Sequence, residues 1–360
     1  FKMRKILSFI FVSLAWACTK PELVTKTITP QSEFIRITGR VKQEGDSVTL
    51  YWSGTNVTAR FTGKELKALL RDERGENYFN IVIDGDSLRY IKLDTVKKYY
   101  TLAAGLSPGE HTVELVKRNE WATGKTWFYG LEVTGEMAAL PPANTRVIEF
   151  FGNSITAGYA IEDYTGADRS DSIFTNNYYT YAALTARHYH ADAYYTVKSG
   201  IGILVSWFPL IMPELYDRLD PNDSLSKWDF KKVTPQIVVI NLFQNDSWLV
   251  EKPEHPSFKQ RFGDKAPNKA QIVAAYKSFV TKVRGVYPDA HIICALGSMD
   301  ATREGSVWPG YVQQAVDELK DKKIYTHFFP FMGKAGHPLK EDNAKMAEEL
   351  IAFIDKTIKW

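Results

Sequence analysis

The pattern of apolar residues changes in kind at Arg146, and this change limits the possible folds more than any other feature. From Val147 onward, short apolar runs that suit buried strands alternate with longer segments of helical spacing. Strands that alternate with helices predict a parallel sheet covered by helices on both faces. The expected strands lie at residues 147–151, 194–197, 237–242, 291–296 and 324–329, and the expected helices at 177–188, 271–286, 309–321 and 339–358.

The residues before this region have an all-β pattern. Short alternating apolar runs recur at close spacing, and turn sequences such as Ser107-Pro108-Gly109 separate them. Runs of this number and length predict a β-sandwich of the jelly-roll type. Prolines 141 and 142 then indicate a linker. We therefore expect a β-sandwich at residues 35–140, bracing an α/β domain at residues 145–360.

The first residues have the pattern of a targeting signal. Basic residues precede the apolar run from Ile6 to Ala17, which is too short to span a bilayer and suits a secretory signal. Cys18 closes this run, so the segment resembles a bacterial lipoprotein signal in which the cysteine carries the lipid. We expect residues 1–18 to be this signal, residues 19–34 to be a tether, and the protein to reach the periplasm or the cell surface. A signal peptide without lipidation is the alternative.

Charge and composition exclude several kinds of partner. The formal net charge of +3 comes from 45 basic and 42 acidic residues that are interspersed, so nucleic acid is not expected to bind. Membrane contact is expected only through a lipid on Cys18. His188 and His190 have no acidic or cysteine partner at ligand spacing, so we expect no metal. No cofactor is expected either. Cys294 lies in an apolar run and is expected in the core.

Polar residues follow the apolar strands at one edge of the expected sheet. Ser154 follows the first strand, Gly200 the second, Asn245 the third and His337 the last. Parallel sheets bind ligands beyond the carboxyl ends of their strands, so these residues are expected to meet.

These residue types suit acyl transfer. The Ser154 hydroxyl becomes a nucleophile when a base removes its proton, and His337 has the side chain for that work near neutral pH. The backbone N–H groups of Ser154 and Gly200 and the side-chain amide of Asn245 are the expected donors to the oxyanion.

Four short blocks make the second domain resemble the SGNH hydrolases, also called the GDSL-like lipase and esterase group. They are Gly152-Asn153-Ser154-Ile155-Thr156, Ser199-Gly200, Leu242-Phe243-Gln244-Asn245-Asp246 and His337-Pro338, in the order of that family. With the preceding sandwich and the run from Asn177 to Arg187, the chain is similar to carbohydrate esterase family 2. The resemblance implies a flavodoxin-like sheet and the removal of acetyl groups from plant cell-wall polysaccharides such as xylan and glucomannan.

Three residues depart from the pattern of the group. Asn153 replaces an aspartate that organises the turn, and Phe243 replaces the glycine before the oxyanion asparagine. Lys334 stands three residues before His337, where most members have an aspartate, and a lysine cannot accept the imidazole N–H. The resemblance therefore favours a Ser154–His337 dyad in which a backbone carbonyl orients the ring. Asp300, after the fourth strand, is the alternative.

Two other functions stay open. The same dyad acting on a longer acyl chain would make a lipase or thioesterase. A carbohydrate-binding surface protein with decayed hydrolase blocks is the other alternative. Trp207, Trp248 and Trp308 follow strands on the active edge and are candidates for stacking on sugar rings, although aromatic residues also dominate cores.

Overall fold

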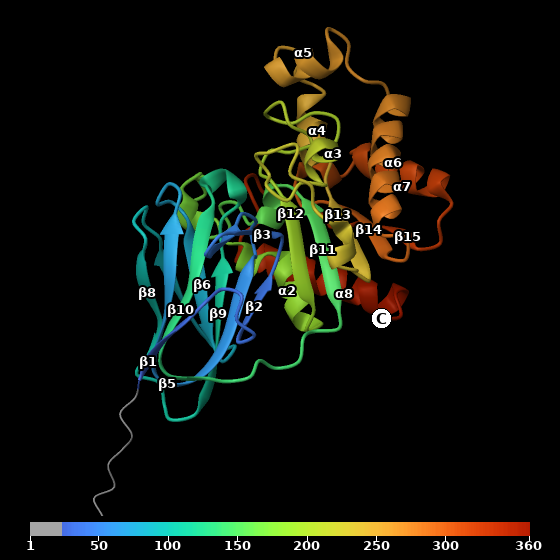
Figure 1. Ribbon diagram of the computed structural model, residues 1–360. Helices are drawn as coiled ribbons and strands as arrows, with labels where there is room; N and C mark the ends of the chain where they lie inside the picture. The colour runs from blue at the N-terminus through green and yellow to red at the C-terminus, as the bar shows by residue number, and fades with distance from the viewer. Residues whose placement is uncertain (1–23) are drawn as a thin grey trace, which may run out of the picture.

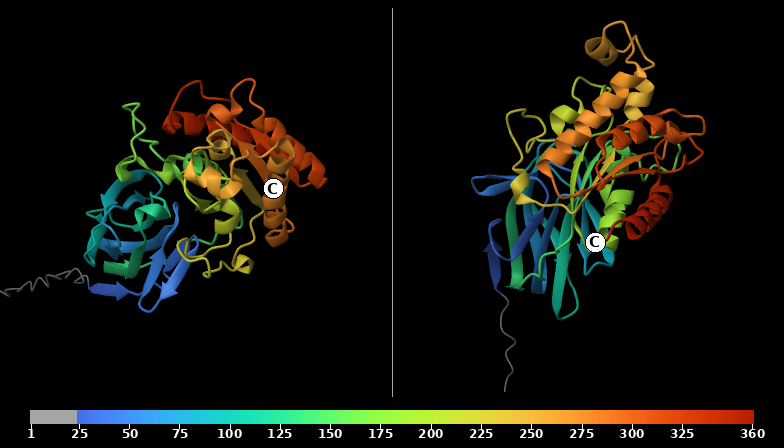
Figure 2. Two further views of the ribbon diagram at one scale, coloured as in Figure 1. Left: turned by 90° about the horizontal axis from the view of Figure 1, so that it is seen from above. Right: turned by 90° about the vertical axis from the view of Figure 1, so that its right-hand side faces the viewer.

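The computed structural model describes residues 24–360, which form two domains that lie side by side (Figures 1 and 2). The expected signal at residues 1–18 and the start of the expected tether lie outside the described residues. Further along, the tether prediction is wrong, because Thr25–Ile28 form strand β1 and pair antiparallel with β10 (Thr126–Met137). No helix between residues 24 and 360 combines the length and apolarity needed to cross a membrane.

The first domain is the antiparallel β-sandwich that the alternating pattern predicts. The long strand β5 connects its two layers, because its first part pairs with β2 and β9 and its later part with β8 and β10. Apolar residues that alternate along these strands fill the space between the layers. The remaining strands are β2 (Ile35–Thr38), β3 (Val41–Glu44), β4 (Ser47–Leu50), β5 (Asn56–Asp72), β6 (Tyr78–Ile83), β7 (Ser87–Lys92), β8 (Lys98–Ala104) and β9 (Glu110–Lys117).

Two glycines let β5 and β10 pass each other where β5 changes layer. A Cβ atom on Gly63 would lie 2.4 Å from the Thr134 carbonyl oxygen, and one on Gly135 would lie 2.1 Å from the Thr62 carbonyl oxygen. Both glycines have φ values above +130°, which a side chain rarely adopts. The register between the strands shifts at this point. The sandwich therefore needs glycine at this crossing.

The second domain is a five-stranded parallel sheet in the order β12-β11-β13-β14-β15, which confirms the flavodoxin-like prediction. Helices α2 and α8 pack on one face, and α6 and α7 on the other (Figure 1). The strands are β11 (Val147–Gly152), β12 (Asp192–Val197), β13 (Ile237–Asn241), β14 (His291–Leu296) and β15 (Ile324–Phe328). The helices are α1 (Ser154–Ala157), α2 (Tyr181–His188), α3 (Met212–Leu215), α4 (Gln244–Leu249), α5 (Pro256–Phe262), α6 (Lys269–Val286), α7 (Trp308–Leu319) and α8 (Lys340–Thr357).

A buried ion pair joins the two domains. Arg40 of the sandwich lies 2.5 Å from Glu149 of β11, and both side chains are 1% exposed. The other oxygen of Glu149 accepts the Tyr287 hydroxyl. Nearby, the Trp52 indole N–H of the sandwich donates to the Leu219 carbonyl at 2.9 Å. These contacts are typical of a fixed interface, because a buried charge is stable only when it is paired.

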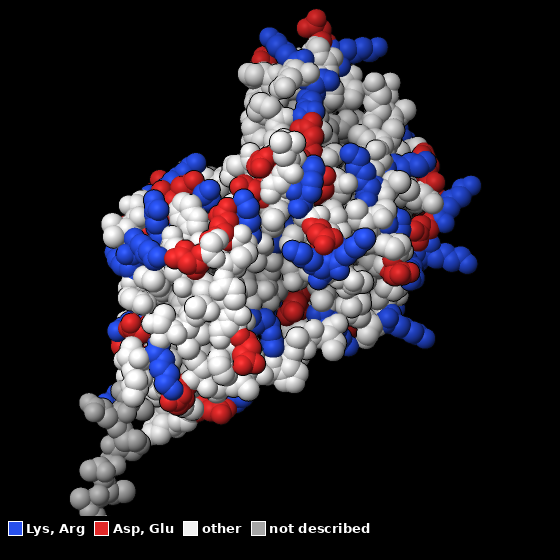
Figure 3. Space-filling view, viewed as in Figure 1, with Lys and Arg blue, Asp and Glu red and all other residues white. Residues whose placement is uncertain are grey.

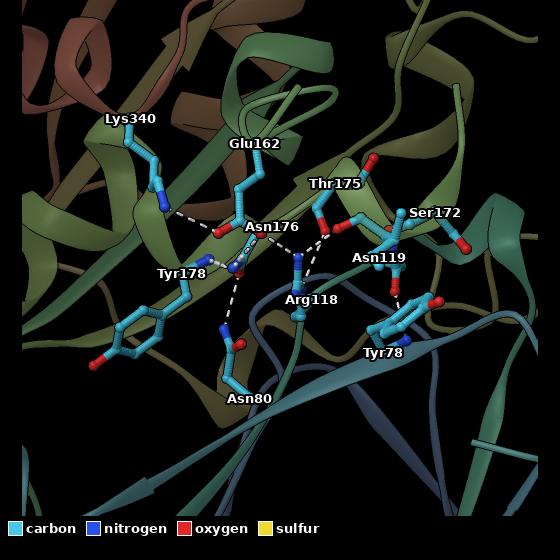
Figure 4. Close-up of polar contacts among 11 residues, drawn as sticks. Tyr78, Asn80, Arg118, Asn119, Glu162, Ser172, Thr175, Asn176, Tyr178 and Lys340 are labelled. Atoms are coloured by element: carbon cyan, nitrogen blue, oxygen red, sulfur yellow. Dashed lines mark hydrogen bonds and ion pairs between the residues drawn. The ribbon is translucent and has the colours of Figure 1, made fainter. Parts of the chain in front are cut away.

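A second polar cluster ties the sandwich to the connection between α1 and α2 (Figure 4). Arg118, 2% exposed, pairs with Glu162, which also accepts from Lys340 Nζ at 3.2 Å. Asn80 of β6 donates to the Asn176 side chain at 2.9 Å. The connection therefore has a defined path. Elsewhere, Figure 3 shows acidic and basic residues interspersed over the visible face of the molecule.

Candidate active site

The turn after β11 presents Ser154 at the carboxyl edge of the sheet. A Cβ atom on Gly152 would lie 2.2 Å from Thr156 Oγ1, so a side chain would clash there. Asn153 caps α1, since its Oδ1 accepts the Ile155 N–H at 3.0 Å. Asparagine therefore organises this turn in the place of the family aspartate.

The structure brings Ser154 and His337 into contact, although they lie near opposite ends of the sequence of this domain. His337 lies in the loop between β15 and α8, and its Nε2 is 2.7 Å from Ser154 Oγ. The ring of Tyr159 packs against the imidazole with centroids 4.6 Å apart. This geometry lets the imidazole accept the serine proton directly.

Asp168 holds the other side of the imidazole. Its two carboxylate oxygens lie 2.9 and 2.8 Å from His337 Nδ1, and one also accepts the His337 backbone N–H at 3.1 Å. Burial opposes the charge of Asp168, but the hydrogen bonds and charge of His337 outweigh it and hold the pKa of this carboxyl below its ordinary value. The site is thus a Ser-His-Asp triad. This corrects the expected dyad with a backbone carbonyl.

Asp300 does not take the orienting role that the sequence offered it. It begins the 3₁₀ turn η5 (Asp300–Thr302), and each of its oxygens lies 3.0 Å from the Trp248 indole nitrogen. Gln244 of α4 donates to it at 2.8 Å. These hydrogen bonds make Asp300 a link between α4 and the segment after β14. Asp168, and not Asp300, contacts the imidazole of His337.

A second aspartate shapes the loop that carries Asp168. The Asp163 side chain is 0% exposed. It accepts hydrogen bonds from Thr165 Oγ1 at 2.6 Å and from the backbone N–H and the guanidinium Nη2 of Arg169, at 2.8 Å each. The Arg169 guanidinium, with the other donors, holds the pKa of Asp163 far below its ordinary value. Asp168 itself has a left-handed φ of +53°. An acidic, polar connection without periodicity was the only sequence signal: Glu162, Asp163, Asp168 and Asp171.

The turn after β12 leaves the Gly200 N–H without an acceptor among the described residues. The N–H groups around it do have acceptors: Lys198 donates to Gly152 O, Ser199 to Glu120, Ile201 to Lys198 O, Gly202 to Ser206 Oγ, and Ile203, Leu204 and Val205 to Asp246. The Ser154 N–H at the start of α1 also has no acceptor in residues 24–360. A developing oxyanion requires such free donors.

The orientation of the Asn245 side chain is fixed from both sides. Its Nδ2 donates to the Ile201 carbonyl at 2.8 Å, and its Oδ1 accepts the Trp207 indole N–H at 3.1 Å. An amide nitrogen carries two hydrogens, so one remains for an oxyanion. Asn245 lies in the first turn of α4, after the strand next to β11.

Phe243 keeps the backbone shape that a glycine would give. Its φ is +83°, in the left-handed region that a bulky residue rarely enters. Its ring is fully buried against Tyr276 and Trp308, with centroids 4.6 and 5.1 Å apart. The packing of this ring offsets a backbone strain of roughly 1 to 3 kcal/mol.

Asp246 anchors the loop that follows the Gly200 turn. Its buried carboxylate accepts the N–H groups of Ile203, Leu204 and Val205 at 2.7 to 3.1 Å. Burial raises the pKa of Asp246 to about 6, against the effect of these hydrogen bonds. Asp246 therefore holds this loop in place and is not one of the reacting groups.

The three candidate tryptophans have different environments. Trp207 is 42% exposed and contacts Asn245, which suits a sugar-binding surface. Trp248 is half-buried beside Asp300. Trp308 is only 7% exposed and packs in the core, which is the alternative to stacking that its sequence position left open. Cys294 is fully buried, as predicted.

The fold and the site together define an esterase of the SGNH hydrolase type. Residues 37–142 match the family described as "Carbohydrate esterase 2 N-terminal". A cellulase/esterase, CelE, of Acetivibrio thermocellus is 34% identical over 321 residues, which are 86% of this chain and 38% of that protein. This chain thus spans well under half the length of that relative.

Two further relatives match over almost their whole length. An acetylxylan esterase/glucomannan deacetylase of Cellvibrio japonicus is 24% identical over 93% of this chain and 92% of its own length. The structure of a family two carbohydrate esterase from Clostridium thermocellum in complex with cellohexaose is 33% identical, with a TM-score of 0.79, over 89% of this chain and 98% of that one. The chain belongs to carbohydrate esterase family 2.

Proposed function

We propose that this protein removes O-acetyl groups from a plant cell-wall polysaccharide of the xylan or glucomannan type. The observation that carries the proposal is the 2.7 Å contact between Ser154 Oγ and His337 Nε2, with Asp168 on the other ring nitrogen. An intact triad supports an enzyme over a decayed binding protein. The similarity to the acetylxylan esterase/glucomannan deacetylase of Cellvibrio japonicus supports an acetylated polysaccharide as the substrate.

The geometry suits a double displacement through an acetyl-enzyme. His337 takes the Ser154 proton while Oγ attacks the acetyl carbonyl, and Asp168 stabilises the imidazolium that forms. The N–H groups of Ser154 and Gly200 and the amide of Asn245 receive the oxyanion. Collapse breaks the bond to the sugar oxygen, which takes the proton from His337. Water then attacks the acetyl-serine with the same base and releases acetate.

Substrate recognition and location follow from the same proposal. Trp207 offers an exposed ring at the site, and its N–H bond to Asn245 places it beside the oxyanion donor. Such a ring suits a pyranose face. The expected signal at residues 1–18, with Cys18 as its lipid site, would place the enzyme outside the cytoplasm, where cell-wall polysaccharides occur.

The decisive experiment compares the wild type with S154A on three substrates: acetylated xylan, 4-nitrophenyl acetate and 4-nitrophenyl palmitate. We expect the wild type to release acetate from xylan and nitrophenol from the acetyl ester, and S154A to lose nearly all of both activities. A preference for palmitate would favour the lipase alternative. Equal rates for wild type and S154A would overturn the esterase mechanism and favour the binding protein.

A further inference from the structure

The β-sandwich places one carboxylate against the turn that carries Gly200. Glu120 lies between β9 and the 3₁₀ turn η1 (Trp121–Thr123) and is 8% exposed. Its Oε2 accepts the Ser199 backbone N–H at 2.6 Å, and its Oε1 lies 3.3 Å from Lys198 Nζ. Ser199 immediately precedes Gly200. A residue of one domain thus holds the backbone next to an expected oxyanion donor of the other.

The conformation of this turn depends on few contacts. Residues 198–201 form a turn closed by the Ile201 N–H on the Lys198 carbonyl at 3.2 Å, with Gly200 at a φ of +82°. The Gly200 carbonyl accepts the Trp207 N–H at 3.1 Å. Glu120 therefore fixes the peptide before Ser199, and Trp207 fixes the peptide after Gly200. These two hydrogen bonds together set the orientation of the peptide between them, which carries the free Gly200 N–H.

Glu120 is itself held firmly at the interface between the two domains. The preceding residues dock there, because the Asn177 N–H donates to the Arg118 carbonyl at 3.1 Å. The following Trp121 packs edge-on against Trp52, with ring centroids 6.5 Å apart, and Lys198 Nζ lies 5.6 Å from its ring. The carboxylate is thus preorganised on both sides, as a support for a catalytic donor must be.

We propose that Glu120 is a positioning residue through which the β-sandwich sets the oxyanion turn of the catalytic domain. The inference rests on the proposed esterase function. Its physical reason is that a buried N–H without a partner is costly, so the peptide of Ser199 would reorient if Glu120 were removed. Reorientation would turn the adjacent Gly200 N–H away from the oxyanion. The negative charge that develops in the transition state would then lose a hydrogen-bond donor. The bound substrate before reaction depends less on this donor.

The test compares E120A, E120Q and N144A with the wild type on 4-nitrophenyl acetate. E120A is expected to lower kcat by about 10-fold to 100-fold, short of the loss of a whole oxyanion donor, with KM within about 3-fold. E120Q keeps an acceptor for Ser199 and is expected to retain kcat within about 3-fold. N144A removes a different hydrogen bond to the catalytic domain, to Asp192 at the amino-terminal end of β12, and is expected to leave kcat near that of the wild type.

A boronic acid supplies a readout that a merely structural role would not change. Methylboronic acid bonds through boron to Ser154 Oγ and passes the serine proton to His337, which leaves an anionic tetrahedral adduct in the oxyanion site. Its affinity is expected to fall in E120A by the same factor as kcat.

Three results would overturn the inference: kcat of E120A within 2-fold of the wild type, E120Q as impaired as E120A, or N144A losing kcat to the same extent. Full activity of S154A would instead defeat the esterase proposal itself, so the two failures are distinguishable.

Discussion

At the scale of single residues, Asp168 is the most informative side chain of the site. It holds His337 Nδ1 with both oxygens and leaves Nε2 to Ser154. D168N would replace one accepting oxygen by an NH2 group and disturb the tautomer that accepts the serine proton. We expect kcat to fall by about 10²-fold to 10⁴-fold, the upper value being that of the equivalent change in a serine protease.

The control for this variant is D300N. Asp300 lies in the same edge of the sheet but bonds Trp248 and Gln244, so its substitution is expected to change kcat by less than about 10-fold. Steady-state kinetics on 4-nitrophenyl acetate separate the two variants. A loss in D300N that equals or exceeds that in D168N would contradict the triad.

Most residues of the site could be predicted from the sequence by one rule about parallel sheets, whereas Asp168 could not. Ser154, Gly200, Asn245 and His337 each come after a strand, and the rule for parallel sheets places those positions together. Asp168 lies in a connection without periodicity, whose path is set by tertiary contacts such as Arg118 with Glu162 (Figure 4). A local pattern cannot show where such a loop goes.

Asp246 gives the stability a pH dependence of definite sign. The folded pKa of about 6 lies above the ordinary value of 3.8, so between these pH values the folded state binds more protons than the unfolded state. Stability from this group is therefore complete below about pH 4 and is lost as the pH rises through 6. A shift of two units corresponds to about 3 kcal/mol.

D246N removes this titration. The unfolding free energy of the wild type minus that of D246N is expected to fall by up to about 3 kcal/mol between pH 4 and pH 7. Urea unfolding at intermediate pH values measures the difference. A constant difference over this range would show that Asp246 does not titrate there.

At the scale of elements, the crossing of β5 and β10 depends on glycine. Gly63→Ala would place a methyl group 2.4 Å from the Thr134 carbonyl oxygen at a φ of +137°. We expect the unfolding free energy to fall by about 2 kcal/mol or more, from strain and overpacking. Gly285→Ala in α6 is the matched control, since no atom beyond the local helix backbone lies within 4 Å of the added methyl. It is expected to stabilise by up to about 1 kcal/mol. Equal effects of the two substitutions would contradict this account.

The elements that the sequence predicted are those that bury an unbroken apolar pattern. The five parallel strands and α2, α6, α7 and α8 lie within a few residues of their predicted bounds. In β5, by contrast, Gly63, Lys64 and Glu65 interrupt the apolar alternation at the bend, so the sequence does not indicate one continuous strand there. Helices α3 and α4 are too short for a helical period to appear. Their positions depend on contacts such as that of Asp246 with Ile203.

At the scale of the whole molecule, two domains with different sheets act as one unit because charges are buried between them. The pair of Arg40 and Glu149 is inaccessible to water, and Tyr287 adds a third member. Such a pair contributes less to stability than its contact distance suggests, because both charges lose their hydration. Removing only one partner lowers the stability strongly, since the remaining charge stays buried without a counter-charge.

This difference predicts a strongly non-additive pair of substitutions. E149M leaves the Arg40 guanidinium with only the carbonyls of Tyr216 and Arg218 as acceptors, and it is expected to destabilise the protein by about 3 to 5 kcal/mol. R40M alone leaves Glu149 unpaired and is expected to cost a similar amount. The double variant R40M/E149M places two apolar side chains in the same space, so its loss should be smaller than that of either single change. Guanidinium unfolding of the four proteins gives the coupling energy. If the double variant instead loses the sum of the two single effects, the pair does not act as one unit, and the domains are joined mainly by contacts such as that of Trp52 with Leu219.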